Sequence, residues 1–247
     1  MTEAITLATW DEVLRAENTP RILYGVVTGA DGHGAGGFAG PRLVVDFGTG
    51  AGFIPAEIIG IPPHVPWAAA SVPLLARAFV GRPVAFRVLA AEADIGHAVL
   101  SRADATAELR SRLEGALVPG AEVEGPVVWA SRSCAVVEVG FCAEILVPAA
   151  EFSYEWPGLV NLKHRVRPGE TLRVRLTDVD GTRLCGSRRA LLRDPWATVP
   201  VRFQRGGRYR ARGLRVTPRG VTVELAPGVY GFQSAQVGPL RPCAAGE

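Results

Sequence analysis

The chain has 247 residues, of which 48% are hydrophobic and 21% charged, and its formal net charge is +3. This composition is that of an ordinary soluble globular protein with room for two domains or a little more. The longest apolar runs are interrupted by Pro, Gly or charge well short of a membrane span, which excludes a transmembrane helix. The first residues lack a basic start and a cleavage site, so we expect no signal peptide and a cytoplasmic location.

Four signals follow one another from residue 21 onward, and all four recur later in the chain. The first copy comprises residues 21–27, 42–58, 80–94 and 98–105. The second copy comprises residues 118–131, 134–152, 166–180 and 184–192. Each copy predicts five short strands, three in a meander and two after a long connection, which is typical of an OB-type Greek-key barrel.

A third copy begins after Pro195 and is incomplete. Residues 206–216 match the first strand, with Gly213 in the place of Gly25 and Gly125. Residues 219–235 match strands two and three, and no match to strands four and five follows. A three-stranded half barrel has an apolar face and an open edge, and both need cover.

We therefore predict a mainly β protein built of tandem five-stranded OB-type Greek-key barrels. Leu109, Leu113 and Leu117 recur at fourfold spacing, which predicts a linker helix between the barrels. The expected division is a first repeat at 10–105, a linker helix at 106–117, a second repeat at 118–194 and a truncated third repeat at 195–240.

The net charge hides a strong asymmetry along the chain. Residues 1–160 carry 10 Arg against 18 Asp and Glu, a net charge of −8. Residues 161–220 carry 16 Lys and Arg against 4 Asp and Glu, a net charge of +12. A basic segment of this size is typical of a protein with a polyanionic partner.

The stretch from Arg202 to Val216 has two interpretations. Its composition is that of a disordered Arg/Gly tail that coats RNA, whereas its pattern is that of a strand, because Arg208, Arg210 and Arg212 alternate with Tyr209, Ala211 and Gly213. The match to the first strand of the repeat favours the second interpretation. We therefore expect these arginines to lie in register on one strand face.

Short phrases in each copy resemble one known family. They are "GFIPAEI" and "LVPAAEF" after strand three, "LSRADA" and "GSRRALL" at the end of strand five, and "LLRDPW" before the third copy. In this order they resemble the ribosomal protein S-one family of RNA-binding OB-fold repeats, over about residues 10–235. They look most like that protein's N-terminal repeats, which the family associates with ribosome docking.

The chain departs from the family where RNA-binding copies carry aromatic residues on strand two and a His after strand three. The second copy has Ser133, Val136 and Pro148 at these positions, and the first has Val44 and Pro55. The third copy has Arg219, Thr222 and Ser234 there. The sequence therefore predicts charge contacts in place of a stacking platform.

The leading hypothesis is a non-catalytic RNA-binding protein that contacts single-stranded RNA or the ribosome, in translation. The arginines would bind phosphates with little sequence preference, and Tyr209 and Phe203 would either stack on bases or pack in a core. The predicted nucleic-acid-binding residues are Arg173, Arg175, Arg183, Arg188, Arg189, Arg205, Arg208, Tyr209, Arg210, Arg212, Arg215 and Arg219. For Arg188, and for Arg102 at the same place in the first copy, a phosphate contact and a barrel-closing ion pair both stay open.

The alternative is a protein–protein docking module on the ribosome or an RNA-processing complex. The acidic first half and the missing aromatics favour it, with the open edge of the third unit adding a strand to a partner.

An enzyme is a third and weaker interpretation. The pairs Asp178 with Asp180, and Asp46 with Glu57, are candidate acid–base or metal carboxylates, but solvated strand ends explain them as well. We expect no catalytic residue, no cofactor and no metal, because neither the four Cys nor the four His have metal-ligand spacing.

Overall fold

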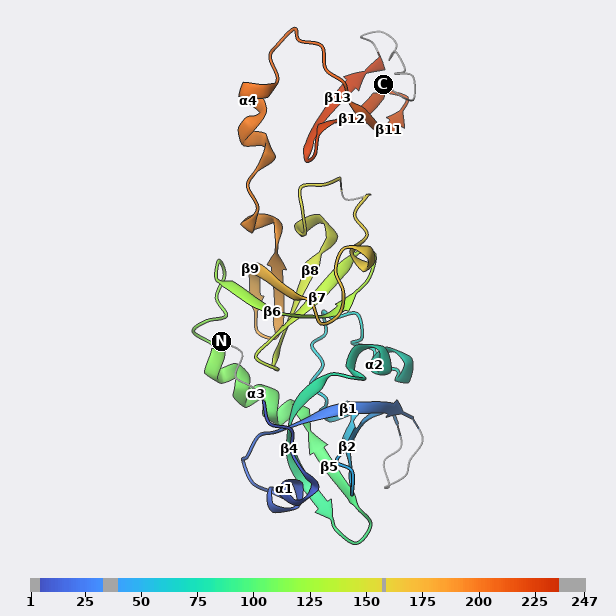
Figure 1. The fold of residues 1–247 in the computed structure, drawn as a ribbon, viewed down its shortest axis with the longest axis vertical. Helices are drawn as coiled ribbons and strands as arrows, with labels where there is room; N and C mark the ends of the chain where they lie inside the picture. Colours follow the sequence, from blue (N-terminus) through green and yellow to red (C-terminus); the bar gives the residue numbers. More distant parts are fainter. Residues whose placement is uncertain (1–4, 33–39, 157–158, 236–247) are drawn as a thin grey trace.

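The computed structural model describes residues 5–32, 40–156 and 159–235. Two closed five-stranded barrels and a three-stranded sheet follow one another along the long axis of the molecule (Figure 1). The predicted fold class, tandem OB-type barrels with a truncated third repeat, is confirmed.

Barrel one has the strand order β1-β2-β3-β5-β4, in which β3 and β5 are parallel and the other pairs antiparallel. A helix, α2 (Val72–Phe79), lies in the long connection between strands three and four. A short helix, α1 (Trp10–Arg15), precedes the barrel and has a capping box between Thr9 and Glu12. The strands are β1 (Leu23–Asp31), β2 (Arg42–Asp46), β3 (Ala51–Pro55), β4 (Pro83–Glu92) and β5 (His97–Ser101).

Barrel two repeats this topology in the order β10-β8-β7-β6-β9. Short 3-10 turns follow strand three at Ala149–Glu151 and precede strand four at Leu162–His164. The strands are β6 (Glu122–Ala130), β7 (Cys134–Val139), β8 (Ala143–Pro148), β9 (Thr171–Asp180) and β10 (Arg183–Ser187).

The third unit is an antiparallel meander that follows two 3-10 turns at Arg189–Leu191 and Pro195–Thr198 and the short helix α4 (Val199–Arg202). Its strands are β11 (Arg212–Thr217), β12 (Gly220–Ala226) and β13 (Val229–Ser234). The expectation that the first strand begins near Gly206 is wrong, because residues 206–211 belong to no strand. Arg208, Tyr209 and Arg210 therefore lie in the connection that leads into β11.

The linker helix, α3 (Arg102–Leu113), starts directly after β5, where the Ser101 hydroxyl accepts a hydrogen bond from the Asp104 amide at 3.2 Å. It begins earlier than the expected residue 106 and ends four residues before Leu117. Leu117 nevertheless packs in the core of barrel two, because its amide still bonds to the Leu113 carbonyl. Leu109, Leu113 and Leu117 thus lie on one face that packs against barrel two and continues past the end of the helix.

Glycine on the first strand lets two strands of each barrel approach closely. A Cβ atom on Gly125 would lie 2.0 Å from the carbonyl oxygen of Glu138, and a Cβ atom on Gly25 would lie 2.6 Å from a Val45 methyl group. A Cβ atom on Gly213 would not be crowded in this way, since its nearest neighbour, a Val221 methyl group, would lie 3.9 Å away. The crowding comes with closure of the barrel, which the third unit lacks.

One hydrophobic core extends from barrel one into barrel two. Trp67, in the connection before α2, is fully buried, and its ring centroid lies 5.4 Å from that of Trp129 on β6. The Arg77 guanidinium stacks on the Trp129 ring, 4.0 Å from the ring centroid, and donates to the Ala130 carbonyl at 3.2 Å. Val128 and Val136 of barrel two belong to the same cluster as the interior of barrel one. The two barrels are therefore packed together as one unit.

Among the described residues, no helix is long and apolar enough to cross a membrane.

Candidate nucleic-acid interface

Strands two and three of each unit present an outward face on which the family's RNA-binding residues are expected. In barrel two this face carries Val136 and Glu138 on β7, opposite Leu146 and Glu144 on β8. Val136 is fully buried and packs against the core of barrel one. The outward face of barrel two is thus closed by its neighbour.

Two carboxylates on that closed face bind arginines from barrel one. Arg102 is fully buried, and its Nη2 lies 2.5 Å from Glu144 Oε1 and 3.4 Å from Glu138 Oε1. Arg82 donates to the same Glu138 oxygen at 2.8 Å. Burial disfavours the charged form of Arg102, but Glu144 and Glu138 more than offset this and hold its pKa above the ordinary value. For Arg102 the structure answers the open question: it makes ion pairs that join the barrels.

The same face of barrel one carries little free charge. Phe53 on β3 is covered by the Arg42 guanidinium at 4.3 Å from the ring centroid, and Arg42 in turn pairs with Asp31 at 2.6 Å. His97 on β5 meets the edge of the Phe53 ring at 5.1 Å, beside a cavity of about 250 Å³. The family pattern does not predict this aromatic pair, because Phe53 stands on strand three and His97 on strand five.

The predicted arginines on β9 of barrel two are exposed, but they share one acidic partner. Arg173 and Arg175 bind the two carboxylate oxygens of Glu122 on β6 at 2.6 and 2.8 Å. The hydrogen bond from Arg175, and then the charge of Arg173, hold the pKa of Glu122 below its usual value. These guanidiniums are partly neutralised, although their remaining donors face solvent.

The arginines around β10 lie in different environments. Arg183 is exposed and stays 4.0 Å from Asp178, whereas Arg189 pairs with Glu151 at 2.6 Å. Arg188 is half-buried, donates to the Phe152 carbonyl at 3.4 Å and stacks over the Phe152 ring at 4.7 Å. No carboxylate in the described part of the chain pairs with Arg188.

The connection into β11 holds the most exposed arginines. Arg205, Arg208 and Arg210 are all exposed. The Tyr209 ring packs edge-on against Phe203 at 5.0 Å, and its hydroxyl oxygen accepts from the Gln204 amide at 2.6 Å. Tyr209 is still 43% exposed, so this pair stiffens a surface loop and does not belong to a core.

The third sheet brings two arginines and an aromatic ring onto one face. Arg215 on β11 pairs with Thr222 on β12, which pairs with Phe232 on β13. Directly paired residues of antiparallel strands point to the same side, and Arg212 shares that side through its partner Glu224. Phe232 is 59% exposed, so a ring stands beside cations as a stacking site requires.

Phe232 is a functional candidate that sequence reasoning missed. The family pattern directed attention to strand two, whereas this ring stands on strand three, in the phrase "GFQSA" that the repeat itself had matched. Arg219 is exposed in the turn between β11 and β12. Within the part of the chain that the structure describes, no ion pair forms at Arg205, Arg208, Arg212, Arg215 or Arg219.

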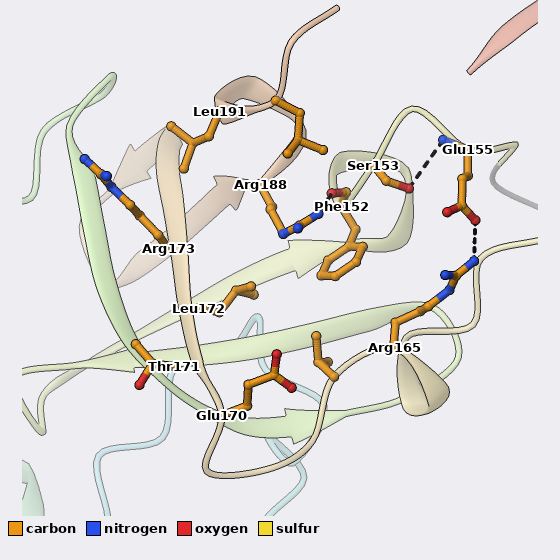
Figure 2. Close-up of a pocket in the computed structure, with 12 residues that line it drawn as sticks. Phe152, Ser153, Glu155, Arg165, Glu170, Thr171, Leu172, Arg173, Arg188 and Leu191 are labelled. Carbon is orange, nitrogen blue, oxygen red and sulfur yellow. Dashed lines mark hydrogen bonds and ion pairs between the residues drawn. The ribbon is translucent and has the colours of Figure 1, made fainter. Parts of the chain in front are cut away.

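A pocket of about 610 Å³ opens on barrel two (Figure 2). Phe152, Leu172 and Leu191 give it apolar walls, and Arg188 points across it toward the Phe152 carbonyl. Arg165 and Glu155 form an ion pair of 2.5 Å at its rim. The charges around the pocket are mixed, so it is not a simple anion site.

The described residues form no group of three or more His, Cys, Asp or Glu that could hold a metal ion. Asp178, one of the carboxylates weighed for catalysis, is exposed and faces Arg183, and Asp46 caps its own turn by accepting from the Gly48 amide at 2.8 Å.

Comparison with known proteins finds a ribosomal protein of similar sequence. The chain is 28% identical over 196 residues to small ribosomal subunit protein bS1 of Streptococcus pneumoniae, and the match covers 77% of this chain. The resemblance to the ribosomal protein S-one family is confirmed. The matched region spans only 46% of that relative, so this chain corresponds to about half of its length. No family model matches the chain.

Solved structures are more distant. GSP13 from Bacillus subtilis is 19% identical with a TM-score of 0.23, and the match covers 34% of this chain and 53% of that one. A multidomain protein with nucleic acid binding domains from Streptococcus pneumoniae is 15% identical with a TM-score of 0.22, over 90% of this chain and 65% of that one.

Proposed function

We propose that the protein is a non-catalytic RNA-binding protein that works in translation, in the cytoplasm, through its C-terminal basic unit. The observation that carries this proposal is the face of the third sheet, where Arg212, Arg215 and Phe232 lie together. Glu224 stands opposite Arg212 on this face, but among the described residues neither arginine forms an ion pair. The similarity to a ribosomal protein supports an RNA partner. Guanidiniums would bind phosphates, and the ring would stack on a base of a single strand.

Within this proposal the predicted arginines differ in rank. Arg205, Arg208, Arg210, Arg212, Arg215 and Arg219, with Tyr209, surround or lie on the third sheet and are the primary contacts. Arg173, Arg175 and Arg189 already bind carboxylates and would contribute less, because RNA must compete with Glu122 and Glu151. Arg183 is exposed beside Asp178 and would add to long-range attraction.

Filter binding of the whole chain to single-stranded RNA over a series of salt concentrations tests the proposal. We expect affinity to fall linearly on a log–log plot with a slope of about −0.7 for each phosphate contacted. An absence of binding even at low salt would refute an RNA-binding function.

A docking function on the ribosome is the second candidate, and a specific observation favours it. The outward face of barrel two, which the family uses for RNA, is here buried against barrel one of the same chain. The face of barrel one lies in the acidic part of the chain and would suit a basic protein. Co-sedimentation with ribosomes before and after RNase treatment separates the two functions, because docking on protein survives the nuclease.

A further inference from the structure

The pocket on barrel two lies at the position in the repeat that corresponds to the site on barrel one where barrel two is bound. In barrel one the Val27 amide donates to the Arg82 carbonyl at 3.0 Å, and in barrel two the Val127 amide donates to the Glu170 carbonyl at 2.8 Å. Arg82 binds the carboxylate of the neighbouring barrel, whereas Glu170 lines the pocket. The two positions are therefore equivalent in the repeat.

A second pair of equivalent residues confirms the match. Arg102 and Arg188 each follow the buried serine that ends strand five. Nη1 of Arg102 donates to the Ile59 carbonyl at 3.0 Å, and Nη1 of Arg188 donates to the Phe152 carbonyl at 3.4 Å. Ile59 and Phe152 each stand four residues after the proline that ends strand three. The other side of Arg102 binds Glu144, while the other side of Arg188 faces the pocket.

The two carboxylates that Arg82 and Arg102 of barrel one bind have a counterpart in the third unit. Glu138 and Glu144 are direct partners across β7 and β8. The sequence of β12 and β13 aligns with these strands without a gap, which places Glu224 at Glu138 and Tyr230 at Glu144. Glu224 and Tyr230 are direct partners as well.

We propose that the pocket is a docking socket for the β12–β13 hairpin of the same chain, with the Glu224 carboxylate bound by Arg188. The third unit would then sit on barrel two as barrel two sits on barrel one. The docked face is the one that carries Arg212, Arg215 and Phe232, so docking and RNA would compete for it.

The hairpin already touches the rim of this socket. The Tyr230 hydroxyl donates to the Tyr154 carbonyl at 2.6 Å, and the Tyr230 ring meets Trp156 at 5.4 Å. Glu224 is the cross-strand partner of Tyr230, so it lies on the same side of the sheet, the side that faces the pocket rim. A strand of the third sheet enters the corner of the close-up in Figure 2.

A difference at one equivalent position makes the proposed junction between barrel two and the third unit weaker than the junction between the two barrels. The first socket has two arginines, Arg82 and Arg102, whereas the second has Glu170 and Arg188. Glu170 repels the carboxylate that Arg188 attracts, so the net attraction is small. Glu170→Arg restores the two-arginine socket and should tighten the junction.

Amide hydrogen exchange of the whole chain, read by mass spectrometry over residues 220–234, tests the proposal. We expect Glu170→Arg to slow exchange in β12 and β13 by about tenfold, the effect of one added charge-assisted hydrogen bond, and Arg188→Ala and Glu224→Gln to accelerate it. The gain from Glu170→Arg should vanish when Glu224→Gln is also present, because the two variants act on one contact. Glu92→Arg, an exposed change of equal charge on barrel one, is the matched control and should leave exchange in the hairpin unchanged.

Two outcomes would overturn the proposal. One is unchanged exchange in a Glu170→Arg variant whose circular dichroism shows a folded chain. The other is a slowing that grows with protein concentration, which would assign the socket to the hairpin of a second copy. Filter binding of the same variants to single-stranded RNA is a separate measurement, so a failure of docking is distinguishable from a failure of the proposed function.

Discussion

Arg102 of barrel one and Glu144 of barrel two lie 2.5 Å apart, and each side chain is 1% exposed. Breaking a buried pair by removing one partner leaves an uncompensated charge, which typically costs about 3–5 kcal/mol. We expect Arg102→Met to lower the free energy of urea unfolding by this amount. Arg21→Ala, which removes an exposed pair with Glu12, should cost less than about 1 kcal/mol. Equal effects of the two variants would show that the junction is not held by the buried charges.

The contact between Trp67 and Trp129 gives a second prediction for the same junction. Trp67 is fully buried, and its truncation to Ala leaves a cavity between the barrels. We expect a loss of about 3–5 kcal/mol in unfolding free energy and faster hydrogen exchange in β6. Trp196→Ala is the matched control, because Trp196 is 49% exposed and should tolerate the change. A stable Trp67→Ala variant would contradict a shared core.

Cys142 gives a prediction about alkaline pH. Burial, with the nearby charge of Glu144, raises the pKa of its thiol to about 11 from 9.0. The folded state therefore keeps its proton above pH 9 where the unfolded state loses it, so this group's contribution to stability falls as the pH rises from about 9 to about 11. Cys142 should also react more slowly with iodoacetamide at pH 8 than the half-buried Cys134 and Cys185. Mass spectrometry of the alkylated peptides measures the order.

Phe232 should contribute more to RNA affinity than Tyr209. Stacking of a base on an aromatic ring is worth about 1–3 kcal/mol, so Phe232→Ala should weaken binding of single-stranded RNA by about 5- to 150-fold. Tyr209 packs edge-on against Phe203, and its removal should mainly loosen the loop. Val201→Ala, at an 83% exposed position of α4, is the neutral control. An unchanged dissociation constant for Phe232→Ala would remove stacking from the proposed interface.

The repeats were predictable from the sequence because their turns and buried strands carry local signals. Gly25 and Gly125 mark the crowded point of each barrel, and the proline at the end of strand three recurs in both. The junction between the barrels was not predictable, because Glu138 and Glu144 alternate with apolar residues and therefore resemble solvent-facing strand positions. The adjacent pair Val136 and Val137 was the available signal, since an apolar residue on each face of a strand indicates that both faces are buried.

The start of β11 was mispredicted for a related physical reason. Alternation of Arg208, Tyr209 and Arg210 suits a strand, but a strand needs a partner, and the ladder between β11 and β12 begins only at Arg212, opposite Glu224. Without a fourth strand on the other side, residues 207–211 have no ladder to join. Pairing therefore overrides local pattern at this position.

The salt dependence of RNA binding tests the central claim, that the arginines of the third sheet contact phosphates. Two variants lose the same charge: Arg212→Ala with Arg215→Ala on β11, and Arg21→Ala with Arg112→Ala on exposed positions of the first half. The account predicts that the β11 variant lowers the magnitude of the log–log salt slope by about 1.4, two phosphate contacts at 0.7 each, whereas the control variant leaves the slope unchanged. Equal slopes for the two variants would contradict the account.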